Sequence, residues 1–224
     1  NPVWVKSEDG SFEATFEFES AAWEAEFDAE GNWLESSKEL AEVDMPAKAM
    51  EYLKVFYADL PTEFEYVKIP DLEMYCAEMM KDSTEMEVCF DMDGNVSKDK
   101  NNVVLAKLNE ISAGATDIVW TKLEDESYNA VYSLDDYTWK TGFNADGSWI
   151  CSGAEIPAEE LPAVVNQYLE KMNSFMVESS KMRVTIDGEQ FVVDGKMKEA
   201  SIRFIFDQEG NFIEQVELPE VVAE

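Results

Sequence analysis

Hydrophobic and polar residues alternate along most of the chain, in short runs that polar turns separate. Phe12, Ala14 and Phe16 alternate with polar residues, and Trp23, Ala25 and Phe27 do the same after Glu19-Ser20. A period of two is typical of a strand that buries one face. The pattern predicts antiparallel hairpins that are covered on one side only.

The predicted register of these hairpins follows from their turns, because directly opposed residues have a constant index sum. A turn at Asp82-Ser83 opposes Tyr75 with Phe90 and Met79 with Met86. In the other three hairpins the same rule gives the pairs Phe12 with Phe27, Tyr128 with Phe143 and Phe191 with Phe206. Each predicted hairpin therefore has one apolar face.

A second pattern is an internal repeat. The segments FDAEGNW, FDMDGNV, FNADGSW and FDQEGNF begin at Phe27, Phe90, Phe143 and Phe206. A longer period of 116 residues aligns Trp4 with Trp120, Trp23 with Trp139, and Pro46 with Pro162. The second copy departs from the pattern at Val96, so we expect two repeat halves, 1–110 and 111–224.

Helical spacing of apolar residues predicts helices over Pro46–Leu60 and Pro157–Phe175, and a weaker one over Asn102–Ser112. Asp44 is the expected N-cap of the first helix. Helices segregated onto one face of antiparallel sheets define an α+β fold. We expect tandem repeats of a four-stranded sheet plus helix, with the other sheet face open.

The amino-acid composition argues against several classes of function. The chain has 49 acidic and 17 basic residues, no histidine and a formal charge of −32, yet 46% of its residues are hydrophobic. So many apolar residues predict a folded protein. The charge argues against nucleic acid as a partner, and the lack of histidine excludes histidine catalysis and histidine metal sites. No apolar run is long enough to span a membrane. Because residue 1 is Asn, we expect that a signal segment or lipid anchor has been removed.

The acidic turns allow two interpretations. Their Gly is the fourth residue, whereas a calcium loop of the EF-hand type has Gly at position 6. A three-residue hairpin loop with a left-handed Gly explains the pattern better. It opposes Phe27 with Trp33 and Phe143 with Trp149. No cofactor is expected, and weak Ca²⁺ binding is the alternative, with the candidate ligands Asp28, Asp91, Asp93, Asp146 and Asp207.

The cysteines and tryptophans are also assigned from the register. Cys76 and Cys89 are opposed on the predicted open face, and both a disulfide and two free thiols are consistent with the pattern. Cys151 has no evident partner. The tryptophans of the hairpins are expected in the core, and they are Trp23, Trp33, Trp139 and Trp149.

The open sheet face is the candidate binding surface, the alternative being a merely solvated sheet. By alternation, its candidate binding residues in the first half are Glu13, Glu17, Glu24, Glu26, Met74, Glu78, Met80, Glu85 and Glu87. In the second half the face carries Asn129, Val131, Ser133, Thr138 and Lys140. A surface so rich in carboxylates would steer a protein with a basic surface to it.

The Trp-to-Phe hairpins with their Gly turns, followed by Met-Pro or Leu-Pro helix starts, resemble the PepSY-like family, also called β-lactamase-inhibitor-like. The best-matching stretches are Trp23–Leu53 and Trp139–Leu169, and the repeat extends the resemblance over nearly the whole chain. The resemblance implies a periplasmic, cell-surface or secreted bacterial protein with sheet faces open for binding. It implies no catalytic residues.

Three functional hypotheses follow. The first is a non-enzymatic, exported binding protein, inhibitor-like, that engages its partner through the acidic sheet face. The alternative is a Ca²⁺-responsive envelope protein that uses the acidic turns. The third is an acid-dependent hydrolase with two facing carboxylates.

Overall fold

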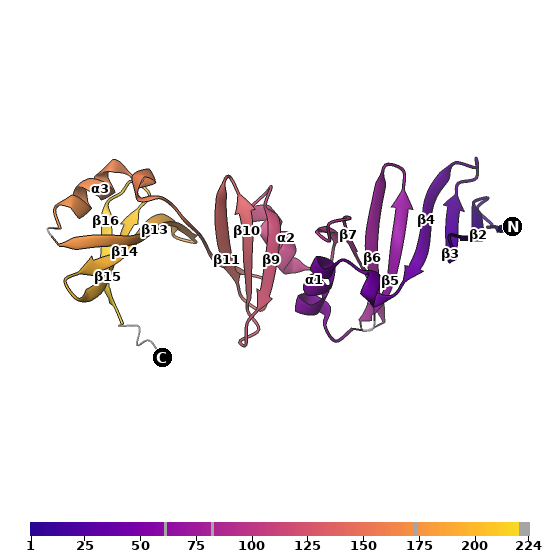
Figure 1. Cartoon of the computed structure of the whole chain (residues 1–224), viewed down its shortest axis with the longest axis horizontal. Coiled ribbons are helices and arrows are strands. Elements are labelled where there is room, and N and C mark those ends of the chain that lie inside the picture. The colour runs from indigo at the N-terminus through magenta and orange to yellow at the C-terminus, as the bar shows by residue number, and fades with distance from the viewer. Residues whose placement is uncertain (61, 82, 173, 220–224) are drawn as a thin grey trace. The chain divides into compact units, whose positions relative to one another are not determined.

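The computed structural model describes residues 1–60, 62–81, 83–172 and 174–219, which form two eight-stranded antiparallel sheets and three α-helices (Figure 1). The chain divides into two compact units, Asn1–Ala106 and Lys107–Glu224. The predicted α+β class with tandem repeats of antiparallel sheet is confirmed. The division into halves at residues 110 and 111 stays a prediction.

Both sheets are meanders, in which each strand pairs with its neighbours in sequence. The first sheet has the strands β1 (Val3–Lys6), β2 (Phe12–Phe18), β3 (Ala21–Phe27), β4 (Trp33–Leu40), β5 (Thr62–Ile69), β6 (Leu72–Lys81), β7 (Thr84–Phe90) and β8 (Val96–Asp99). The second has β9 (Thr116–Lys122), β10 (Tyr128–Leu134), β11 (Tyr137–Phe143), β12 (Trp149–Glu155), β13 (Phe175–Thr185), β14 (Gly188–Met197), β15 (Ala200–Asp207) and β16 (Phe212–Leu218). We call β1–β4, β5–β8, β9–β12 and β13–β16 modules 1 to 4.

The predicted register is confirmed in the central hairpin of every module. Its apolar pairs are Phe12 with Phe27, Tyr75 with Phe90, Tyr128 with Phe143 and Phe191 with Phe206. Glu19 and Ser20 both have positive φ, as a two-residue hairpin turn of type I′ requires. In module 2 the predicted turn residue Asp82 lies outside the described residues.

The Asp-x-x-Gly turns are hairpin loops, as predicted. Gly31 has a φ of 86°, and a bulge follows where the register shifts between Glu26 and Phe27. The bulge opposes Phe27 with Trp33, and the same arrangement opposes Phe143 with Trp149. The extra residue of the bulge in module 1 is Leu34, which lies between the pairs Phe27–Trp33 and Glu26–Glu35.

The helices are α1 (Ala47–Tyr57), α2 (Val103–Ile111) and α3 (Ala163–Glu170), with short 3₁₀ helices at Glu42–Asp44 and Ala158–Glu160. The prediction that Asp44 caps the first helix is wrong, because Asp44 belongs to a 3₁₀ helix and Pro46 is the N-cap. The predicted helix Pro157–Phe175 is also divided. A residue before proline avoids the helical region, and Leu161 before Pro162 is extended, with a ψ of 144°.

Two of the helices pack on the module that follows them in sequence. In α1, Tyr52 lies edge-on to Phe90 of module 2, with 5.8 Å between ring centroids. In α3, Tyr168 packs in the same way on Phe206 of module 4, at 5.3 Å, and Figure 1 shows α3 beside β14 and β16. This face of each sheet carries the apolar side of the hairpins.

A polar network joins α1 to the start of α2. Tyr52 and Tyr57 each donate a hydrogen bond to the Asp99 carboxylate, at 2.7 Å and 2.8 Å. Buried Asn102 donates to the Tyr52 hydroxyl at 2.8 Å and accepts the backbone N–H groups of Val104 and Leu105, so that it caps α2. Burial and the adjacent Asp99 raise the pKa of Tyr52. The hydroxyl therefore stays a hydrogen-bond donor.

Candidate functional site

The face of the first sheet that points away from α1 holds two rows of directly opposed glutamates. One row crosses β2, β3 and β4 and consists of Glu13, Glu26 and Glu35. The other crosses β5, β6 and β7 and consists of Glu63, Glu78 and Glu87. Like charges directly opposite each other on a sheet destabilise it, by about 0.2–1 kcal/mol a pair. The fold keeps these rows despite that cost.

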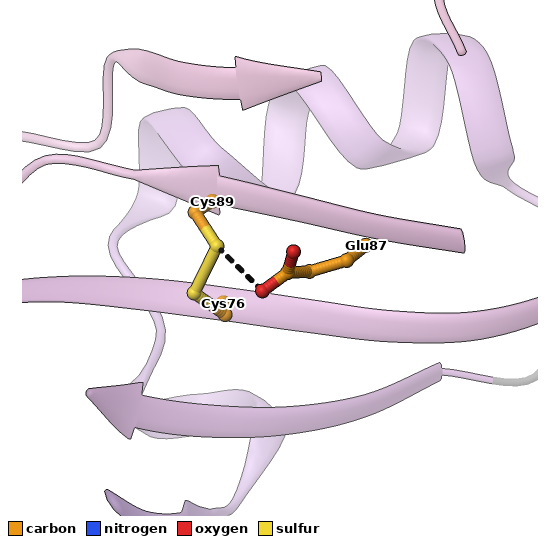
Figure 2. Close-up of side chains that lie close together, drawn as sticks. All are labelled: Cys76, Glu87 and Cys89. Carbon is orange, nitrogen blue, oxygen red and sulfur yellow. Dashed lines mark hydrogen bonds between the residues drawn. A yellow bond between two sulfur atoms is a disulfide. The ribbon is translucent and has the colours of Figure 1, made fainter. Parts of the chain in front are cut away.

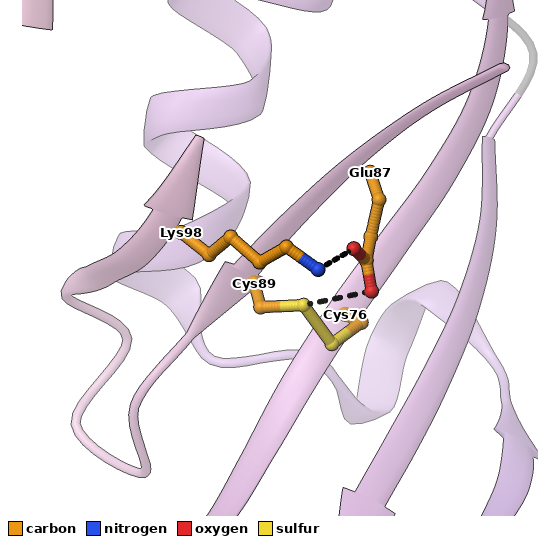
Figure 3. Close-up of polar contacts among 4 residues, drawn as sticks. All are labelled: Cys76, Glu87, Cys89 and Lys98. Carbon is orange, nitrogen blue, oxygen red and sulfur yellow. Dashed lines mark hydrogen bonds and ion pairs between the residues drawn. A yellow bond between two sulfur atoms is a disulfide. The ribbon is translucent and has the colours of Figure 1, made fainter. Parts of the chain in front are cut away.

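Further glutamates lie on the same face by strand alternation. We call this set the acidic face, and its members are Glu13, Glu17, Glu24, Glu26, Glu35, Glu39, Glu63, Glu65, Glu78, Glu85 and Glu87. Among the described strand residues, Lys98 on β8 is the one basic side chain on it, and it forms an ion pair with Glu87 (Figure 3). The carboxylates thus face one another with little compensation by cations.

Burial, together with the neighbouring carboxylates, raises the pKa of three members of the acidic face. Burial, followed by the charge of Glu26, raises the pKa of Glu35 above its ordinary value. Burial also raises the pKa of Glu65 and of Glu78, assisted by repulsion from other glutamates of the acidic face. All three shifts favour the neutral acid, so the face holds its full charge only at a pH above the ordinary range of glutamate.

We predict that removing these three charges stabilises the fold at neutral pH. For a carboxyl whose pKa is raised in the folded state, stability falls as the pH rises from the ordinary pKa to the raised one, and the full cost is present above the raised pKa and absent below the ordinary one. The face variant Glu35→Gln, Glu65→Gln, Glu78→Gln should gain about 1 kcal/mol at pH 7, judged from the cost of opposed like charges, and nothing near pH 4. Urea unfolding at the two pH values measures the difference.

The control variant Glu30→Gln, Glu42→Gln, Glu51→Gln removes the same net charge at exposed positions outside the acidic face. It should leave the stability nearly unchanged at both pH values. An equal gain in both variants would attribute the effect to net charge alone and contradict the prediction.

The part of the acidic face on β5, β6 and β7 includes an apolar, closed region, contrary to the polar surface that alternation predicted there. Cys76 and Cys89 are only 2% and 1% exposed, and they cluster with buried Val67, against which Ile69 and Met74 pack. The reason is that neighbouring strands place apolar side chains beside the two cysteines on the same face. Of the other predicted residues, Met80 is exposed.

Cys76 and Cys89 form a disulfide, which decides between the two alternatives that the sequence left open (Figure 2). Glu87 Oε1 lies 3.4 Å from Cys89 Sγ. A disulfide sulfur carries no proton, so this is a close contact and not a hydrogen bond. The disulfide ties β6 to β7 within the acidic face.

Several of the potential metal ligands of the acidic face and of the turns have other partners in the structure. Within the described residues, the one group of three metal-type ligands that lie close together is Cys76, Glu87 and Cys89, and the disulfide occupies both sulfurs. The turn carboxylates bond within their own loops: Asp28 accepts the backbone N–H and the side-chain amide of Asn32, both at 2.7 Å. These bonds lower the pKa of Asp28. Calcium binding by Asp28, Asp91, Asp93, Asp146 and Asp207 stays a prediction.

The corresponding face of the second sheet has a different character. It carries the basic residues Lys140, Lys181, Arg183, Lys196 and Arg203. Arg203 donates to both carboxylate oxygens of Asp194, at 2.6 Å and 2.8 Å, which lowers the pKa of Asp194. The concentrated negative charge therefore belongs to the first sheet and not to both.

Sequence reasoning identified most of the acidic face and missed the residues on the two central strands of the sheet, β4 and β5. Glu35, Glu39, Glu63 and Glu65 were not among the predicted binding residues, although they lie in the same rows. Their strands, β4 and β5, are joined through a helix and pair without a tight turn, so no index sum gives their register. The alternation of Glu35, Ser37 and Glu39 was the available signal.

None of the helices in the described residues is long and apolar enough to cross a membrane.

Comparison with known proteins identifies the family. No curated protein matches the chain. Among solved structures, a BLIP-like protein from Bacteroides fragilis is 17% identical, with a TM-score of 0.48, over 55% of this chain and 89% of that chain. A DUF2874 family protein from Bacteroides uniformis is also 17% identical, with a TM-score of 0.45, over 51% and 87%. A protein from Bacteroides eggerthii described as "putative periplasmic" is 15% identical, with a TM-score of 0.44, over 52% and 87%.

One family model matches twice, at residues 10–98 and 126–214, which together make up most of the chain. Each match begins near the central hairpin of an odd-numbered module and ends in or near the last strand of the next, so the matched unit is a pair of modules. The chain belongs to the family described as "Putative beta-lactamase-inhibitor-like, PepSY-like".

Proposed function

We propose that this protein is a non-enzymatic, exported binding protein, inhibitor-like in mode, that holds a basic protein surface against its acidic face. The family description is that of inhibitor-like proteins and not of enzymes. The chain contains no histidine, so the commonest acid–base catalyst is missing from its chemistry.

This proposal is based on the two rows of opposed glutamates. Opposed like charges reduce the stability of the sheet that holds them, and a fold has no structural use for six of them in two straight rows. A partner that brings lysines or arginines to the rows relieves the repulsion. The backbone of a sheet keeps the carboxylates in fixed positions, which suits them for recognising a pattern of positive charge.

Export is supported by the disulfide between Cys76 and Cys89. Structural disulfides form and persist in oxidising compartments such as the bacterial periplasm, and they are rare in the cytosol. Because this disulfide is buried within the acidic face, the stability of the face depends on an oxidising compartment. The disulfide thus supports the proposal that the protein acts in the periplasm, at the cell surface or outside the cell.

The test is affinity capture from a bacterial envelope extract, followed by measured binding of the recovered partner to three proteins. These are the wild type, the face variant and the control variant defined above. The wild type and the control variant should bind alike, and binding should weaken as salt rises. The face variant should bind at least about tenfold more weakly at low salt, although its fold is the more stable one.

Two outcomes would refute the proposal. One is that no partner is recovered even at low salt, and the other is that the face and control variants bind equally well. Because the face variant gains stability, weaker binding by it cannot be attributed to unfolding.

A further inference from the structure

The two oxygens of the Glu87 carboxylate have different neighbours, as Figure 3 shows. Lys98 donates a hydrogen bond to Oε2, whereas Oε1 lies 3.4 Å from Cys89 Sγ. Glu87 precedes Cys89 by two residues on β7, and Lys98 is directly opposed to Cys89 on β8, so the three side chains share one face of the sheet. Lys98 therefore holds the carboxylate with its other oxygen directed at the disulfide.

The disulfide makes no use of this oxygen. A disulfide sulfur has no proton to donate, whereas a thiol donates a weak hydrogen bond and a thiolate binds metal ions. An acceptor that lies beside a group without a proton gains no hydrogen bond from it. The position of Glu87 thus suits the reduced form of Cys76 and Cys89 better than the oxidised form.

Reduction would turn these side chains into a set of metal ligands. Cys76 Sγ, Cys89 Sγ and one oxygen of Glu87 all lie within 4.8 Å of one another. Two ligands of a tetrahedral Zn²⁺ ion are roughly 3.5–3.8 Å apart, because the metal–ligand bonds are about 2.0–2.3 Å long. The Cβ atoms of directly opposed residues are about 4.5–5.5 Å apart, so the two freed sulfurs can separate to that distance without a movement of the strands.

The surroundings give an ion access to the site and attract it. The two cysteines are only 2% and 1% exposed, but the side chain of Glu87 is 37% exposed and lies beside them (Figure 2). An ion therefore reaches the sulfurs from the Glu87 side. The carboxylates of the acidic face raise the concentration of divalent cations near this entrance.

We propose that reduced Cys76 and Cys89, together with Glu87, form a binding site for a thiophilic divalent cation, with Zn²⁺ as the occupant and water as its fourth ligand. Thiolates select Zn²⁺, whereas Ca²⁺ and Mg²⁺ bind through oxygen ligands. Because Lys98 holds Oε2, Glu87 binds the ion through Oε1. The inference goes beyond the proposed function, since it concerns the reduced protein and involves no partner.

Reduction and metal binding are two balanced steps. A dithiol gives two electrons and two protons to the Cys76–Cys89 bond, which breaks into two thiols while the dithiol closes to its own disulfide. Zn²⁺ then displaces the two thiol protons, which pass to the solvent, and bonds to both thiolates and to Glu87. The metal ion and the disulfide are thus alternative links between β6 and β7, and they exclude each other.

The test uses the protein with the substitution Cys151→Ala, in which Cys76 and Cys89 are the only cysteines. One sample stays oxidised, and the other is reduced with a dithiol in urea and refolded without oxygen, after which the dithiol is removed. Calorimetric titration with ZnCl₂ should give one bound ion per reduced chain and none of comparable affinity in the oxidised chain. Zn²⁺ should also raise the urea midpoint of the reduced chain, because a cation that bound the unfolded thiols equally well would not shift it.

Matched variants of the reduced chain identify the carboxylate ligand. Glu87→Gln should weaken Zn²⁺ binding at least about tenfold, because the loss of a ligand costs more than the loss of an outer hydrogen bond to a ligand. Glu85→Gln removes the same charge from the same face of β7, two residues from Glu87, and should leave the affinity nearly unchanged. CaCl₂ in place of ZnCl₂ should not distinguish the reduced chain from the oxidised one.

Four outcomes would overturn the proposal. They are equal Zn²⁺ affinity of the reduced and oxidised chains, a urea midpoint of the reduced chain that Zn²⁺ does not move, equal effects of Glu87→Gln and Glu85→Gln, and a reduced chain that stays unfolded when Zn²⁺ is added. None of these measurements involves the basic partner, so the metal site can fail while the binding function of the acidic face stands, and the reverse also holds.

Discussion

Replacing Phe90 with Ala is expected to lower the free energy of unfolding by about 4 kcal/mol, the largest effect that we predict for a single substitution. Phe90 is the last residue of β7, and its side chain is fully buried against the ring of Tyr52 in α1. Its removal leaves a cavity that the helix and the sheet cannot both close. Urea unfolding followed by tryptophan fluorescence measures the change.

The repeat supplies a matched comparison for this experiment. Phe27 occupies the equivalent position in module 1, where the face is open and Trp4 is the packed aromatic neighbour, at 5.3 Å between ring centroids. Phe27→Ala should cost about half as much as Phe90→Ala, because the side chain is only half-buried. Equal costs at the two positions would contradict this prediction.

Removing the Cys76–Cys89 disulfide is expected to cost about 3 kcal/mol of stability. The bond spans a sequence separation of 13 residues, and closing a loop of that length restricts the unfolded chain by about this amount. The double variant Cys76→Ala, Cys89→Ala should unfold at a lower urea concentration than the wild type. Added dithiol should destabilise the wild type to a similar extent.

Two controls separate the bond from other effects of the reductant. Dithiol should not change the stability of the double variant, and the variant Cys151→Ala should respond to dithiol as the wild type does, since Cys151 is a free cysteine. A wild type that is insensitive to dithiol even under unfolding conditions would contradict the prediction.

The register of the hairpins could be predicted because the position of a tight turn determines which residues of the two strands are paired. Two-residue turns such as Glu19-Ser20 determine which residues face each other, and the apolar pair Phe12 with Phe27 then identifies the buried face. The helices were harder to delimit. Their positions follow from apolar spacing, but their starts depend on where Pro46 and Pro162 force the preceding residue out of the helical region.

Burial was the least predictable property, because it depends on what lies above a residue and not on the residue itself. Trp33 and Trp149 have the same place in their repeats, yet Trp33 is exposed and Trp149 is half-buried. Cys76 was assigned to an open surface, and it is closed off by apolar neighbours from adjacent strands. Alternation along a strand predicts to which face of the sheet a side chain points. It does not predict which side chains or elements pack over that face.

The meander order of both sheets has a consequence for the way in which the chain acquires its structure. Within each sheet, all paired strands are consecutive in sequence, so the contact order of the sheets is low for an all-antiparallel arrangement. Each hairpin closes over a short loop, on a time scale of about 1–10 μs, without waiting for a distant segment. A polypeptide that becomes free to fold from one end can therefore build its sheets strand by strand, in the order in which the strands emerge.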